Sequence, residues 1–150
     1  MVMKQPDHPS APAAALAADL AALIGKLKRR LRETANAGDL TQSQLSVLGR
    51  LSRHGPATVT TLARADGMRP QSMGATVAAL QAAGLVSGAP DPADGRQTIL
   101  SLTPACEEMI RAGRAARQQW LFRAIDTRLS AAEQQQLAAS LDLLRRLAES

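Results

Sequence analysis

The side chains best suited to contact another macromolecule cluster just after residue 68. Arg69 supplies a guanidinium and Gln71 an amide. Ser72 and Thr76 supply hydroxyls, and Ala75 supplies a small methyl group. An amide can form a bidentate contact with adenine, and a guanidinium can meet guanine or phosphate. Gln71 also has an ordinary interpretation as a first-turn polar residue, because many protein–DNA contacts only position the protein.

A second candidate is Arg96, which lies in the stretch DPADGRQTILSLT. A guanidinium beside a glycine at the tip of a turn is always charged and narrow enough for an A·T-rich minor groove. Asp91 and Asp94 precede it, and the turn chemistry of aspartate accounts for both without a catalytic role.

The elements that position these side chains can be predicted from periodicity. Met73, Val77 and Leu80 share one face of a helix. Pro70 suits the first helical position and Gly84 the C-terminal end. The small and polar residues named above then lie on or near the opposite face, so this helix can approach another surface closely.

The sequence on either side of this helix completes a recognisable unit. Thr58 can cap a short helix that buries Leu62 and ends near Gly67, which makes a helix-turn-helix pair. The segment after Gly84 reads as two short strands joined by a glycine- and proline-rich turn that starts at Gly88. A helix pair followed by a hairpin outlines a winged helix, in which the second helix enters the major groove of DNA.

Leucine stripes mark both ends of the chain. The seam Leu16, Leu20, Leu23, Leu27 and Leu31 is of coiled-coil kind, and the last helix repeats the pattern with Leu137, Leu141 and Leu144. A winged helix does not need these stripes for its own core, so we expect them to bury against a second copy. The predicted organisation is a disordered tail (1–11), an N-terminal dimerisation helix (12–39), a winged helix-turn-helix lobe (40–103) and C-terminal dimerisation helices (104–150).

Composition supports a mostly helical fold with a small β-hairpin wing. The chain is 45% hydrophobic but only 1% aromatic, so leucine, alanine, valine and methionine must form its core. A net charge of +5 suits a polyanionic partner. No 18-residue apolar run is present, which argues against a membrane partner.

The other residues that could carry chemistry also have structural explanations. Cys106 lies near a helix N-terminus, where a thiol pKa falls, so it is either a reactive thiol or a small buried residue. His8, His54 and this cysteine make no metal-ligand spacing. No phosphate loop, nucleophile elbow or catalytic carboxylate pair is present, so neither a cofactor nor an enzyme activity is expected. We expect an anionic effector to bind a set of basic side chains, which are Arg50, Arg53 and His54 together with Arg29 or Arg30.

Three stretches resemble the MarR-type transcriptional regulators. LTQSQLSVLGRLSRHGPATVTTLARADGM is similar to the family's helix pair, QSMGATVAALQAAGLV to its recognition helix, and DPADGRQTILSLT to its wing. The resemblance implies that Arg96 enters the minor groove and that Asp94 helps to hold it. It also implies a homodimer that binds a pseudo-palindromic operator, usually as a repressor, and that a small molecule or thiol oxidation relieves binding.

The leading hypothesis is therefore a cytoplasmic, homodimeric regulator that binds double-stranded DNA and responds to a small-molecule effector. The alternative is a winged-helix module that docks protein partners without reading DNA. The alanine-rich recognition helix favours the alternative slightly. The modest net charge of residues 41–103, which contain five arginines and three aspartates, also favours it.

Overall fold

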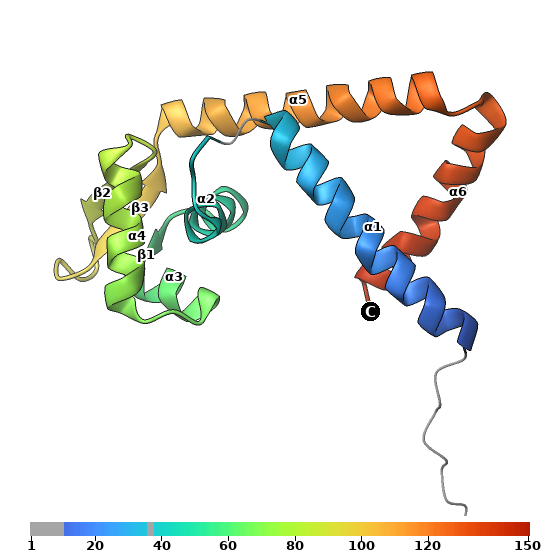
Figure 1. Ribbon diagram of the computed structural model, residues 1–150. Coiled ribbons are helices and arrows are strands. Elements are labelled where there is room, and N and C mark those ends of the chain that lie inside the picture. The colour runs from blue at the N-terminus through green and yellow to red at the C-terminus, as the bar shows by residue number, and fades with distance from the viewer. Residues whose placement is uncertain (1–10, 36–37) are drawn as a thin grey trace, which may run out of the picture. The chain divides into compact units, whose positions relative to one another are not determined.

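The chain folds into α-helices and one small antiparallel sheet, and its contacts divide it into two units. The computed structural model describes residues 11–35 and 38–150 (Figure 1). We call residues 37–116 the winged lobe, and residues 1–36 with 117–150 the helical unit. The expected disordered tail, residues 1–11, lies outside the described residues apart from Ala11, where the first helix begins.

The winged lobe follows the order that the sequence predicts. In chain order its elements are α2 (Gln42–His54), β1 (Ala57–Thr58), α3 (Val59–Asp66), α4 (Pro70–Ala82), β2 (Val86–Pro90), β3 (Thr98–Leu102) and the first turns of α5 (Pro104–Arg128). The start of α2 illustrates how the sequence determines a boundary. The Thr41 hydroxyl accepts the Gln44 amide at 3.2 Å, and the Gln44 side chain accepts the Thr41 amide at 2.9 Å. Two backbone donors that a helix start leaves unpaired are thereby satisfied.

The sheet has three strands, of which the hairpin was expected and β1 was not. The strand order is β1-β3-β2, with Thr58 opposite Ile99 and Gly88 opposite Leu100. Our placement of Gly88 at the start of the turn was wrong, because that residue pairs within β2. A two-residue strand such as β1 has too little sequence pattern to be recognised without its partner.

An aliphatic core joins the helices and the sheet of the winged lobe. Met73, Val77 and Leu80 of α4 are buried as predicted. On α2, Val47 is fully buried beside Leu48. The complete set of buried residues is Val47, Leu48, Leu51, Leu62, Ala63, Met73, Val77, Leu80, Val86, Leu100 and Cys106.

The winged lobe extends beyond the range 40–103 that the sequence indicated. Cys106, in the first turns of α5, is fully buried, and Ile110 one turn later packs against the same core. The first half of α5 therefore completes the core, and the compact unit reaches residue 116.

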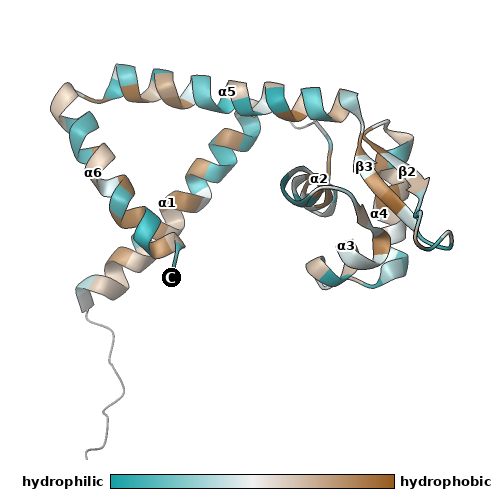
Figure 2. Ribbon diagram, turned by 180° about the vertical axis from the view of Figure 1, so that it is seen from behind, coloured by the Kyte–Doolittle hydropathy of each residue, from teal (hydrophilic) through white to brown (hydrophobic). Residues whose placement is uncertain are grey.

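The helical unit contains α1 (Ala11–Ala35), the second half of α5 and α6 (Ala131–Ala148). Figure 2 shows apolar and polar residues alternating along these helices. α6 has no buried residue, and its Leu147 is 60% exposed; on α5, Phe122 is 62% exposed. Large apolar side chains therefore remain uncovered in a single chain.

Candidate nucleic-acid interface

Local sequence signals mark both ends of α4, the candidate recognition helix. Arg69 precedes it with extended backbone, and Pro70 occupies the first turn. At the other end, Gly84 adopts a left-handed φ of 73°. Its amide donates to the Gln81 carbonyl at 3.0 Å and the Leu85 amide to the Leu80 carbonyl at 3.0 Å, which is a Schellman motif. The local sequence therefore defines where α4 begins and where it ends.

The outward face of α4 carries the predicted contact residues. Gln71, Ser72 and Ala75 are exposed, and Arg69 is exposed at the helix start. Thr76 is half-buried, and its hydroxyl donates to the Ser72 carbonyl at 3.3 Å. The hydroxyl of Thr76 is therefore already engaged, and the exposed surface consists mainly of one amide, one hydroxyl and small methyl groups.

The wing tip is ordered by two aspartate turns. The Asp91 carboxylate accepts the Ala93 amide at 2.9 Å, and the Asp94 carboxylate accepts the Arg96 amide at 3.1 Å. The Gln97 amide donates to the Asp94 carbonyl at 3.0 Å. Asp94 therefore binds the backbone of Arg96, while the Arg96 side chain is exposed and forms no ion pair with any residue in the described ranges.

The hairpin depends on close approach at Gly88. A Cβ atom added there would lie 2.7 Å from Cγ2 of Thr98 and 3.2 Å from Nε2 of Gln81. These neighbours lie on β3 and near the end of α4, so the missing side chain lets the wing pack against the recognition helix.

An ion pair between Arg50 and Asp66, which the sequence did not predict, links α2 to α3. The Arg50 Nε atom donates to Asp66 Oδ1 at 2.8 Å, and its Nη2 atom donates to the Ala65 carbonyl at 3.0 Å. The Ser46 hydroxyl donates to the same carboxylate oxygen at 3.1 Å. This network fixes α2 to the end of α3, directly before the turn that leads into α4. No local motif marks a pair separated by 16 residues.

The expected effector-binding cations belong to two different units, with Arg29 and Arg30 on α1 and the others on α2. Arg50 is engaged by Asp66, whereas Arg53 and His54 are exposed at the end of α2. Arg29 belongs to α1, in the other unit, beside Lys28. These four residues therefore do not form one site within either unit.

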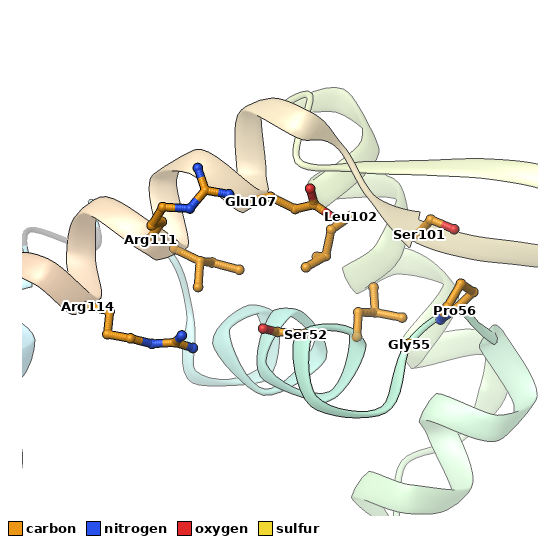
Figure 3. A pocket seen from close by; sticks show the side chains of 10 residues that line it. Ser52, Gly55, Pro56, Ser101, Leu102, Glu107, Arg111 and Arg114 are labelled. Atoms are coloured by element: carbon orange, nitrogen blue, oxygen red, sulfur yellow. The ribbon is translucent and has the colours of Figure 1, made fainter.

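The winged lobe instead contains a different pocket with a cavity volume of about 420 Å³. Its apolar walls include Leu51, Leu102 and Ile110. Figure 3 shows the guanidinium of Arg114 reaching from α5 toward Ser52 on α2. The full lining is Leu51, Ser52, Gly55, Pro56, Ser101, Leu102, Glu107, Ile110, Arg111 and Arg114. Sequence analysis missed this pocket because its lining comes from three separate segments.

Cys106 has the environment of a buried structural residue. It is fully buried, and burial, followed by the nearby Glu107 carboxylate, raises the pKa of its thiol. Its amide donates to the Thr103 hydroxyl at 3.1 Å, and that hydroxyl donates to the Gly84 carbonyl at 2.7 Å. The reactive-thiol interpretation is therefore not favoured, because a thiol must be accessible and deprotonated to react.

Within residues 11–35 and 38–150, no three His, Cys, Asp or Glu side chains are grouped so that they could hold a metal ion. In the same ranges, no helix is both long enough and apolar enough to span a membrane.

The fold and the exposed face of α4 define a winged helix-turn-helix protein. The chain belongs to the MarR family of transcriptional regulators. The family model described as "MarR family" matches residues 38–97. An uncharacterised HTH-type transcriptional regulator of Mycobacterium bovis is 37% identical over 136 residues, covering 91% of this chain and 94% of that protein. The chain is thus a transcriptional regulator and not an enzyme.

Solved structures agree with this assignment. A crystal structure of a transcriptional regulator protein from Pseudomonas aeruginosa PA01 is 35% identical and superposes with a TM-score of 0.81, covering 94% of this chain and 99% of that one. A mutant of the S. aureus protein MepR, bound to an oligodeoxyribonucleotide, has a TM-score of 0.69 at 20% identity and covers 88% of this chain and 97% of its own. The second similarity concerns the fold alone.

Proposed function

We propose that this regulator is a homodimeric repressor that binds a pseudo-palindromic operator and is released by a small-molecule effector. Each copy places α4 in a major groove and Arg96 in the adjacent minor groove. The observation that carries this proposal is the exposed small-residue face of α4 between two exposed arginines, Arg69 and Arg96.

Physical complementarity supports DNA as the partner. The major groove admits an α-helix, and methyl and amide groups on its surface can reach base edges. Arg69 lies at the N-terminal end of α4, where the unpaired backbone amides also favour phosphate. The winged fold occurs in the oligodeoxyribonucleotide complex of the MepR mutant, which is consistent with the same use here.

The helical unit supports the homodimer. Its helices expose the leucine stripes that the sequence revealed, and Leu23 of α1 is 52% exposed. Exposed apolar patches of this kind commonly mark protein–protein interfaces. A two-fold dimer presents two copies of α4, which matches an operator with two half-sites about one helical turn apart.

The pocket in the winged lobe supports effector control. A cavity of about 420 Å³ falls within the range of small-molecule sites. Arg114 and Ser52 supply a cation and a hydroxyl for an acidic group, beside apolar walls. This pocket replaces Arg29, Arg50, Arg53 and His54 as our proposed effector site.

Selection of bound sequences from a random duplex library, at low and high salt, tests the proposal. We expect a palindrome whose binding weakens steeply with salt, because contacts to phosphate release counterions. The modest positive charge of residues 41–103 favours the alternative, a protein-docking module. Such a module would recover no sequence at either salt concentration.

A further inference from the structure

One ion pair of the winged lobe differs from the other ion pairs of the described residues. Arg50 of α2 and Asp66, the last residue of α3, join two different helices, and their side chains are 33% and 12% exposed. The other three pairs in the described ranges each join residues three positions apart on one helix, and each of those side chains is at least 56% exposed. Exposed pairs of that kind contribute little to stability. Among the described pairs, Arg50–Asp66 is therefore the one that constrains two elements relative to each other.

The Asp66 carboxylate is connected to α2 through two side chains. Its Oδ1 atom accepts the Arg50 Nε donor at 2.8 Å and the Ser46 hydroxyl at 3.1 Å. The Nη2 atom of Arg50 donates to the Ala65 carbonyl at 3.0 Å, which is one of the carbonyls that the end of a helix leaves unpaired. The cation also offsets the unfavourable position of a carboxylate at a helix C-terminus. Because the guanidinium is planar, its two donor directions fix the orientation of the end of α3 against α2.

The end of α3 in turn determines where α4 begins. Only three residues separate Asp66 from Pro70, the first residue of α4. Gly67 has a left-handed φ of 63°, and the Met68 amide donates to the Ala63 carbonyl at 2.9 Å. A connection that is this short and hydrogen-bonded transmits any tilt of the end of α3 to α4. The apolar core keeps the helices together, but apolar contacts have no preferred direction.

We propose that Asp66 is a positioning residue for DNA recognition. Its carboxylate, held by Arg50 and Ser46 of α2, fixes the direction in which α4 leaves the turn and so aligns the contact residues of α4 with base edges. Asp66 itself touches no DNA. The inference rests on the proposed function, in which α4 enters a major groove, and it adds a residue outside the contact surface on which recognition depends.

Charge and positioning predict opposite effects for Asp66→Ala. Removal of a negative charge from a chain of net charge +5 should tighten binding to DNA if charge alone matters. We expect operator binding to weaken by about tenfold instead, which is the size of one lost base contact. Fluorescence anisotropy measures binding to the duplex recovered by the selection and to a scrambled duplex of the same length. Binding to the scrambled duplex should not weaken, because phosphate contacts carry no sequence information.

Three further variants separate geometry from charge. Asp39→Ala is the matched control, because Asp39 is an exposed carboxylate of the same lobe that pairs with no cation of the described residues, and it should not weaken operator binding. Asp66→Asn loses the charge but keeps an oxygen that accepts hydrogen bonds, so it should retain more operator affinity than Asp66→Ala. Arg50→Lys keeps the charge but lacks the planar fork, so it should weaken operator binding as Asp66→Ala does.

Hydrogen exchange tests the same idea without DNA. The Met68 amide reports on the turn before α4, and the Leu85 amide, which donates to the Leu80 carbonyl at 3.0 Å, reports on the other end of α4. In Asp66→Ala, exchange at Met68 should accelerate by at least about tenfold more than exchange at Leu85, because only the start of α4 is released. A general loss of stability would accelerate both amides equally. Exchange at single amides is followed by NMR.

Three results would each overturn the proposal. The first is operator binding by Asp66→Ala that is unchanged or tighter. The second is an equal loss of affinity for the operator and the scrambled duplex. The third is equal acceleration of exchange at Met68 and Leu85. Failure of the proposed function has a different signature, since the natural protein would then select no sequence, and the exchange comparison would still decide whether Asp66 fixes the start of α4.

Discussion

Arg50 and Arg96 carry the same side chain and have opposite roles in the winged lobe. Arg50 is half-buried and donates to Asp66 and to the Ala65 carbonyl, which fixes one helix to the next. Arg96 is held only through its backbone amide, so its guanidinium projects into solvent at the wing tip. The first arginine links α2 to the end of α3, and the side chain of the second is exposed at the wing tip.

Replacing Arg96 with alanine should weaken operator binding by about 1–3 kcal/mol, because in the proposed complex it removes a guanidinium from the minor groove. Arg96→Lys should recover only part of the loss, since lysine retains the charge without the planar fork. Fluorescence anisotropy with a labelled operator measures both effects. Unchanged affinity of Arg96→Ala would remove Arg96 from the interface.

Cys106 should resist alkylation in the native state. Burial raises the pKa of its thiol above the ordinary value of 9.0, so the folded chain retains the thiol proton to higher pH than the unfolded chain does. Stability from this group is therefore present at neutral pH and is lost as pH rises through and above 9. Native protein at pH 8 should react with iodoacetamide at least about tenfold more slowly than denatured protein.

Cys106→Ala is the control for the pH effect. The difference in unfolding free energy between the natural protein and this variant should shrink as the pH is raised from about 8 to about 10. A difference that does not change with pH, or rapid native alkylation, would restore the reactive-thiol interpretation.

At the scale of elements, local chemistry was sufficient to predict the helix boundaries. Thr41 and Gln44 form a capping box at the start of α2, Pro70 occupies the first turn of α4, and Gly84 takes the left-handed conformation after it. Each of these signals acts within a few residues, so a single sequence contains all the information that it needs.

The features that the sequence did not predict depend on residues far apart. Strand β1 is defined only by its pairing with β3, and the Arg50–Asp66 pair joins two different helices. Of the candidate contact residues, Thr76 proved half-buried because its position on the helix lies at the border of the buried face. Chain topology decides such contacts, and periodicity within one element cannot.

Gly88→Ala should destabilise the winged lobe by about 1–3 kcal/mol, because the new Cβ atom overlaps a methyl group of Thr98 on the neighbouring strand. Urea unfolding followed by far-UV circular dichroism measures the change. The matched control is Gly74→Ala within α4, where a new Cβ atom would meet nothing within 4 Å. Gly74→Ala should stabilise the fold by about 0.5–1 kcal/mol through higher helix propensity. Equal effects of the two substitutions would show that contact at Gly88 is unimportant.

At the scale of the whole molecule, the proposed dimer rests on apolar residues that a single chain leaves exposed. Leu141 and Leu144 lie on the apolar stripe of α6 and are 42% and 38% exposed. Changing both to glutamate should shift the protein to monomer at micromolar concentration, because burial of each leucine contributes about 1.5–3 kcal/mol. Analytical ultracentrifugation over a range of concentrations measures this shift.

Gln135→Glu supplies the control, since it adds a charge to α6 at an exposed polar residue without removing a leucine. Operator affinity should fall with dimerisation in the double variant and remain unchanged in the control. A double variant that still sediments as a dimer would place the interface elsewhere.

The aromatic content of the two units has an experimental consequence. Trp120 and Phe122 are the sole aromatic residues of the chain, and both belong to the helical unit. The winged lobe therefore has no aromatic side chain that absorbs above 270 nm, whereas both units contribute to far-UV circular dichroism. Tryptophan emission during denaturation reports on the helical unit alone. Coincident transitions in the two signals would indicate one cooperative unfolding event. Separate transitions would show that the winged lobe and the helical unit unfold independently.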